Sequence, residues 1–321
     1  MRTADRGKLI AILCLIAVAI GWGSIPIFLR YFTHYVDVWT ANGVRYPVGA
    51  LFWLPFVVVL SRRVRLQGQP GPGRSVWRDA VVPSVMNVFG QTGYAASPYF
   101  LPASTVGFVV RLSFLFTVVL GFVLLADERP LARRPVFWVG AATSLGGLVL
   151  MFLDKAQAGA GEHVVGLVLL VATTAAWGGY AVSVRKWMAG YPARLSFGVI
   201  SLYTSGALLL LMLAFGRVRA LGDLSATLWA CLIGSALIGV AFGHVLYYRA
   251  IHRLGPVVSA GVLLITPFVT CLGAAATLGE RMAGVQLLGG VSVLAGGALL
   301  LRAQAQIERD GTRGARAGHP S

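Results

Sequence analysis

Long runs of apolar residues, separated by short polar segments, dominate this chain of 321 residues. Most runs are roughly twenty residues long, which is the length that an α-helix needs to cross a bilayer core of about 30 Å. The pattern therefore predicts an all-α polytopic membrane protein with ten transmembrane helices. The predicted spans are 9–30, 38–60, 80–100, 104–126, 135–153, 164–184, 196–215, 227–250, 257–279 and 285–303.

The second half of the chain repeats the first in degenerate form. The segments 126–153 and 278–301 both carry Gly-x5-Gly-Gly, and Trp22-Gly23 matches Trp177-Gly178. Each half holds five predicted spans, and because five is odd the second half must enter the membrane inverted. We expect a cytoplasmic N-terminus at 1–8, five-helix repeats at 9–153 and 164–303 joined by a linker at 154–163, and a disordered, basic cytoplasmic tail at 304–321.

The charge distribution predicts the orientation. Of the 27 Lys and Arg residues, 20 lie on the side of the N-terminus, 5 on the opposite side and 2 inside spans. The positive-inside rule then predicts that both termini are cytoplasmic, in the inner or plasma membrane. The same rule explains the net charge of +16 without nucleic acid as a partner, and the composition, 57% hydrophobic against 12% charged, points to lipid.

The two arginines inside spans, Arg45 and Arg111, are the main candidates for substrate binding. An arginine within the membrane is costly and normally faces protein or water. No Asp or Glu lies deep in any predicted span to neutralise either one, so a cavity that accepts a carboxylate or another anion is one interpretation. Snorkelling towards the headgroups, or bonding to carbonyls at a broken helix, is the other.

Further candidates are polar or aromatic residues within the spans. His244 and Tyr248 share a helix face and are expected to bind substrate or to pack in the core. The amides Asn42, Asn87 and Gln91 either line a cavity or join helices. Aromatic residues recur at matched places in the two halves, and we expect them either to form a cavity wall or to pack structurally. They are Trp22, Tyr46, Tyr94, Trp177, Tyr180 and Tyr203. Four further tryptophans are expected to lie at the membrane interface or to face lipid: Trp39, Trp53, Trp77 and Trp138.

The motifs of the two halves resemble the drug/metabolite transporter superfamily, in its ten-helix EamA-type branch. The resemblance rests on Trp22-Gly23, Trp177-Gly178, Arg45-Tyr46, Thr266-Pro267-Phe268 and Leu278-Gly279-Glu280-Arg281. It implies the export of small metabolites, often amino acids or their analogues. The first half has Ser113-Phe114 where the second has Thr266-Pro267, so we expect its fourth helix to lack the kink that a proline gives.

We therefore expect an exporter of small metabolites that works by alternating access, with a small-molecule substrate, the lipid bilayer as its surroundings and no cofactor or metal. Exchange or import of small organic or phosphorylated anions is the alternative. Nothing in the spans predicts an enzyme, and a non-transporting scaffold or sensor is the remaining class. The glycine pairs predict close helix packing, within the chain or in a homodimer. Glu280-Arg281 and Glu128-Arg129 are expected to cap and anchor helix ends, with a gating salt bridge as the alternative.

Overall fold

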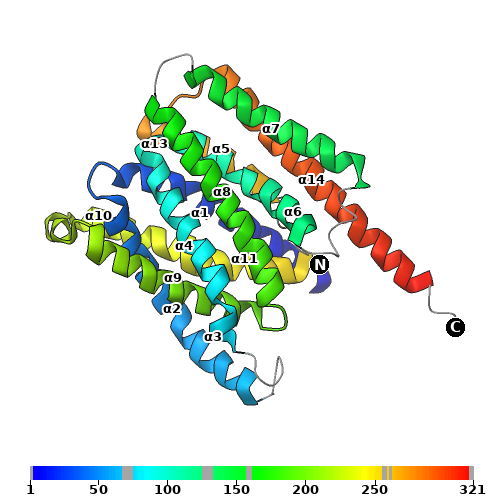
Figure 1. The fold of residues 1–321 in the computed structure, drawn as a ribbon. Helices are drawn as coiled ribbons and strands as arrows, with labels where there is room; N and C mark the ends of the chain where they lie inside the picture. The colour runs from blue at the N-terminus through cyan, green and yellow to red at the C-terminus, as the bar shows by residue number, and fades with distance from the viewer. Residues whose placement is uncertain are drawn as a thin grey trace.

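The computed structural model describes residues 3–66, 75–124, 133–156, 161–254, 259 and 262–317, and the regular elements in these residues are all helical (Figure 1). The first half contributes α1 (Thr3–Phe32), α2 (Val38–Leu66), α3 (Val76–Asp79), α4 (Val81–Ala96), η1 (Ser97–Tyr99), α5 (Ala103–Val109), η2 (Val110–Leu112), α6 (Ser113–Leu124) and α7 (Pro135–Ala156). The second half contributes α8 (Gly161–Trp187), α9 (Ala193–Phe215), η4 (Val218–Asp223), α10 (Ala226–Ala236), η5 (Leu237–Phe242), α11 (Gly243–Leu254), η6 (Leu263–Ile265), α13 (Thr266–Leu278) and α14 (Gly284–Ala317). The prediction of an all-α chain is confirmed.

The described helices include several that can cross a membrane. Seven stretches are long and apolar enough: Leu9–Phe32, Val38–Val64, Ala103–Gly121, Gly161–Trp187, Ala193–Phe215, Ala226–Ala250 and Gly284–Ala303. Two shorter apolar helices cover Pro135–Leu150 and Leu263–Leu278. The multi-pass prediction is therefore confirmed. Helix α4, with 16 residues that include Asn87 and Gln91, belongs to neither group, so the number of ten crossings stays a prediction.

The two halves interlock, because the first helix of each half packs mainly against helices of the other half. Helix α1 packs against α11 and α13 of the second half, and α8 packs against the corresponding α4 and α6 of the first. The remaining equivalent helices pair with each other, α2 with α9 and α7 with α14. Figure 1 shows α7 and α14 side by side along one edge of the bundle. Within the described residues, these helix pairs are thus related by exchange of the halves, as an internal repeat requires.

Glycines hold α7 and α14 close together. A Cβ added to Gly147 would lie 2.5 Å from the carbonyl oxygen of Gly289, and one added to Gly296 would lie 2.5 Å from that of Gly140. Small residues at such a contact let two helix backbones approach closely in lipid. The predicted glycine packing is thus found between the two halves of one chain. Gly146, by contrast, has no atom within 4 Å of such a Cβ.

A short 3₁₀ turn breaks the fourth span of each half at the same place. It is η2, immediately before Ser113, in the first half and η6, immediately before Thr266, in the second. The first half therefore has the 3₁₀ turn without the proline that follows it in the second half, while the expected lack of a proline kink stays a prediction. Helix α6 packs on α8 in the same way as α13 packs on α1. Both halves thus share this packing and the 3₁₀ turn, although Pro267 has no counterpart in the first half.

Helix α14 continues beyond the predicted span, through Gln304 to Ala317. The segment 302–308, Arg-Ala-Gln-Ala-Gln-Ile-Glu, consists almost entirely of good helix formers, and it extends a helix that the apolar part has already nucleated. The predicted disorder of the tail at 304–321 stays a prediction.

Candidate functional site

A cavity of about 340 Å³ lies between the two halves. Its wall is built from α1, α2, α4, η2 and α6 of the first half and from α8, α9, η5 and α11 of the second. The predicted site residues on this wall are Trp22, Arg45, Tyr46, Asn87, Gln91, Tyr94, Arg111, Trp177, Tyr180 and His244. The fold thus brings together residues that are up to 222 positions apart in the sequence, from Trp22 to His244.

Three of the predicted residues lie away from the cavity wall. Asn42 is 2% exposed and its Nδ2 donates to the carbonyl of Gln91 at 3.1 Å, so it joins α2 to α4. Tyr203 is 39% exposed and packs edge-on against Trp77 on the outside of the bundle. Tyr248 lies behind the wall, with its ring against Phe197. A shared helix face with His244 therefore was not sufficient to place Tyr248 in the cavity.

Arg45 is held inside the bundle and does not snorkel. Its side chain is 4% exposed, and its Nε donates to the Oγ of Ser235 at 2.9 Å. Ser235 is completely buried and in turn donates to the carbonyl of Leu232. A serine at the end of α10 therefore orients the guanidinium group of α2 at the cavity wall.

Arg111 reaches the same cavity from η2. Its Nε is buried, and none of the described residues provides it with a hydrogen-bond partner. Tyr94 lies on the same cavity wall as both arginines. Two positively charged groups thus converge on one cavity, and no lining residue in the described part of the chain is Asp or Glu.

A π-helical segment, η5, lies opposite Arg45. It separates α10 from α11 and contributes Gly239 and Val240 to the cavity wall. A π-helical turn displaces a backbone carbonyl from its usual helical partner, and such turns are frequent at functional sites. Here the Nε1 of Trp53 donates to the carbonyl of Val240 at 2.9 Å. The assignment of Trp53 to the membrane interface was therefore wrong, because this tryptophan is completely buried and its indole N–H binds the carbonyl of Val240.

Each cavity tryptophan packs on a glycine of the other half. A Cβ added to Gly243 would lie 2.3 Å from the Nε1 of Trp22, and one added to Gly90 would lie 2.3 Å from the Cδ1 of Trp177. These glycines belong to a repeated Phe-Gly-x-x-x-Tyr pattern, Phe89 to Tyr94 and Phe242 to Tyr247. The sequence thus contained a pattern that places Gln91 and His244 at equivalent positions, and our sequence analysis missed it.

Phe197 is the most prominent wall residue that the sequence analysis missed. Its ring stacks on the imidazole of His244 with a centroid distance of 4.0 Å and an interplanar angle of 23°. The ring of Trp22 lies 5.0 Å from the same imidazole. Ser113, Thr117 and Ser201 were missed as well. Phenylalanine, serine and threonine are too common in apolar helices for one sequence to distinguish those that face a cavity.

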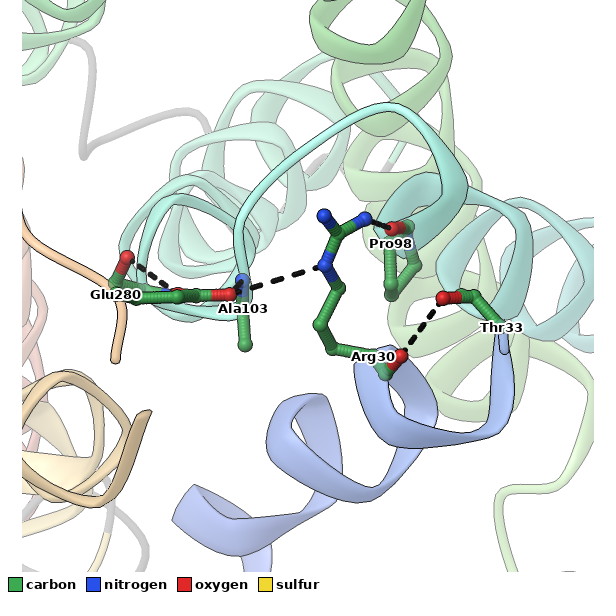
Figure 2. Close-up of polar contacts among 6 residues, drawn as sticks. Arg30, Thr33, Pro98, Ala103 and Glu280 are labelled. Atoms are coloured by element: carbon green, nitrogen blue, oxygen red, sulfur yellow. Dashed lines mark hydrogen bonds and ion pairs between the residues drawn. The ribbon is translucent and has the colours of Figure 1, made fainter. Parts of the chain in front are cut away.

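Glu280 connects the two halves at one end of the bundle (Figure 2). Its Oε1 accepts from the backbone N–H of Ala103 at 2.8 Å, and its Oε2 accepts from the backbone N–H of Ser104 at 3.1 Å. Arg30 lies 3.9 Å from the same carboxylate and donates to the carbonyl of Pro98. Glu280 does cap a helix, but the capped helix is α5 of the other half. Glu128 and Arg129 lie outside the described residues.

Asp37 forms a second connection between the halves. It accepts hydrogen bonds from the backbone N–H groups of Trp39 and Thr40 at the start of α2 and from that of Arg217 in the second half. Burial raises the pKa of this carboxyl, but the hydrogen bonds from Thr40 and Arg217 outweigh burial and hold the pKa below its ordinary value. The predicted spans cross the membrane in alternating directions. They therefore place the segments of Asp37, Arg217, Arg30 and Glu280 on the same side of the membrane.

No group of His, Cys, Asp or Glu side chains that could hold a metal ion occurs among the described residues. The arrangement can instead enclose a small molecule between two repeats, with guanidinium groups on one part of the wall and aromatic rings on another. A helical, multi-pass bundle with a polar cavity between interlocked halves has the architecture of a membrane transporter.

Comparison with known proteins agrees with this class. The model of the EamA-like transporter family matches residues 9–153 and again residues 164–302, so the chain belongs to the EamA-like transporter family. A crystal structure described only as that of a protein has a similar fold, with a TM-score of 0.59 and 17% identity over 93% of this chain and 98% of the other. That similarity concerns the fold alone. A search of curated proteins gave no match.

Proposed function

We propose that this transporter exports small metabolites that carry a carboxylate, such as amino acids or their analogues. The observation that carries the proposal is the pair Arg45 and Arg111, which share one cavity without an acidic partner on its described wall. Guanidinium groups bind carboxylates through paired, charge-assisted hydrogen bonds. A cavity with this charge favours an anionic group over the quaternary ammonium group of a cationic drug.

The mechanism that we propose is alternating access between two inverted five-helix repeats, with ten crossings and both termini in the cytoplasm. It requires no cofactor and no chemical reaction, so we do not propose an enzyme. The position of the cavity between interlocked halves supports this mechanism. The Glu280 and Asp37 connections join the halves at one end, where alternating access needs a contact that can break. The direction follows from the exporters that the family resemblance implies.

The two arginines also favour a second candidate, the exchange or import of small organic or phosphorylated anions. A phosphate group usually engages several basic side chains, and the described wall of this cavity has two. For this reason we place carboxylates first. Homodimer formation remains a separate proposal, because the glycines of the α7–α14 contact act within one chain.

Transport into liposomes that contain the purified protein tests the proposed function. We expect uptake of compounds with a free carboxylate, and little or no uptake of their carboxyl amides or of quaternary ammonium dyes. Arg45→Gln and Arg111→Gln should each reduce the uptake at least tenfold, since each removes one charge from the cavity. Arg219→Gln, at an exposed position in η4, is the matched control and should transport normally. Equal uptake of acids and amides, together with normal activity of both cavity variants, would disprove the proposal.

A further inference from the structure

We infer that the cavity prefers carboxylates without a free ammonium group, such as N-acylated amino acids or simple monocarboxylic acids, over zwitterionic amino acids. This inference rests on the proposed function and narrows its substrate class. It follows from the balance of charges and of hydrogen-bond donors on the cavity wall.

The charges on the cavity wall disfavour an ammonium group. Arg45 and Arg111 are the charged side chains on the described wall. In an α-amino acid a single carbon joins the ammonium group to the carboxylate. A carboxylate held by either arginine therefore brings the ammonium group close to two guanidinium groups. Like charges repel strongly in a buried site, and the described wall offers no carboxylate to compensate.

The hydrogen-bond donors of the wall also favour an anionic ligand. The Nε of Arg111 is buried at the cavity wall and has no hydrogen-bond partner among the described residues. A guanidinium group only donates, so a ligand that binds it must supply acceptor oxygens. A carboxylate and an acyl carbonyl supply acceptors, whereas an ammonium group brings three more donors. The carbonyl of Val240, in the η5 segment of the wall, already accepts from Trp53.

The aromatic wall is the obvious alternative partner for an ammonium group. Such a cation binds over the face of an aromatic ring. One face of Phe197 is covered by His244, at a centroid distance of 4.0 Å. The indoles of Trp22 and Trp177 are fixed against Gly243 and Gly90. Phe197, Trp22 and Trp177 are therefore better placed to contact an apolar side chain or an acyl group than to enclose a cation.

The experiment uses four compounds with one side chain, in which the carboxylate and the amine are blocked separately. They are leucine, N-acetyl-leucine, leucinamide and N-acetyl-leucinamide, tested for uptake into proteoliposomes and for protection of the detergent-solubilised protein against thermal unfolding. We expect N-acetyl-leucine to be transported at least tenfold faster than leucine at the same low concentration. Both amides should be inactive.

The possible outcomes separate the inference from the function on which it rests. If leucine is transported as fast as N-acetyl-leucine, or faster, and the amides remain inactive, the preference is wrong and the carboxylate site stands. If the amides are transported as well as the acids, both are wrong. Folded protein that neither binds nor transports any of the four compounds overturns both as well.

A designed change of preference gives a sharper test. Gln91 lies on the cavity wall one helical turn from Asn87, and Gln91→Glu adds a carboxylate with almost no change in shape. This group can pair with an ammonium group, so the ratio of N-acetyl-leucine to leucine transport should fall at least tenfold. Arg219→Gln controls for a general change in net charge and should leave the ratio unchanged. An unchanged ratio in a folded, active Gln91→Glu variant would contradict the inference.

Discussion

At the scale of single residues, the cavity depends on two glycines as much as on its two arginines. Gly243 and Gly90 provide the space in which the indoles of Trp22 and Trp177 lie. The same arrangement occurs once in each half, with the tyrosines Tyr247 and Tyr94 against the two indoles at centroid distances of 5.1 and 5.0 Å. The repeat therefore preserves a packing unit, while the charges of Arg45 and Arg111 come from the first half alone.

We predict that Gly90→Ala and Gly243→Ala displace the indoles. The added methyl group would lie 2.3 Å from the ring of Trp177 or Trp22, and overpacking of this kind costs about 1–3 kcal/mol. Thermal unfolding followed by tryptophan fluorescence should show the loss of stability, and transport should fall. Gly206→Ala in α9 is the control, because no atom lies within 4 Å of its added Cβ. Equal stability of all three variants would contradict the proposed packing.

At the scale of elements, helix ends are stabilised by groups that are distant in the sequence. The N-terminus of α5, like that of any helix, has backbone N–H groups without an intrahelical acceptor, and Glu280 satisfies two of them from 176 or more positions away. Sequence patterns reveal caps that lie next to the helix they stabilise. A cap supplied by another half of the molecule becomes visible only when the chain is folded.

We predict that Glu280→Ala weakens the start of α5 by about 0.5–2 kcal/mol, the usual cost of losing a helix cap. Hydrogen exchange should become faster at the backbone amides of Ala103 and Ser104, which would lose their acceptors. Glu162→Ala, at an exposed position in the first turn of α8, is the control and should change exchange in this region little. Unchanged exchange in Glu280→Ala would show that the contact contributes nothing to the stability of α5.

At the scale of the whole molecule, the contact between α7 and α14 joins the last helices of the two halves. Backbone atoms themselves meet there, at Gly147 and Gly289 and again at Gly296 and Gly140. Backbone contacts cannot move aside as a flexible side chain can. The two halves therefore depend on this contact for their relative position along one edge of the bundle.

We predict a large difference between substitutions at two adjacent glycines of α7. Gly147→Ala would bring a methyl group to 2.5 Å from the carbonyl of Gly289, and it should lower stability by about 1–3 kcal/mol. Gly146→Ala meets no atom within 4 Å and should be almost neutral. Thermal unfolding and the yield of folded protein in detergent measure both effects. If Gly146→Ala were as harmful as Gly147→Ala, the contact between α7 and α14 would not be the cause.

Several features could be predicted because they depend on local properties of the chain. The length of an apolar run decides whether a helix can cross a bilayer, and the family match then confirmed the repeated architecture. Arg45, Arg111 and His244 could be selected because polar groups within a membrane are costly and so rarely face lipid. Ten of the thirteen predicted site residues lie on the cavity wall for this reason, or because they recur in both halves.

Only the tertiary structure decided which way a side chain with two possible environments points. Trp53 and Trp138 both lie in apolar spans, yet one is completely buried and the other is 55% exposed. The break before Ser113 occurs without a proline, and the cavity role of Phe197 depends on His244, 47 positions away. The sequence by itself determined the membrane helices and their repetition, because both are written along the chain. Packing between distant helices decided the wall of the cavity, because it depends on contacts that a linear pattern does not contain.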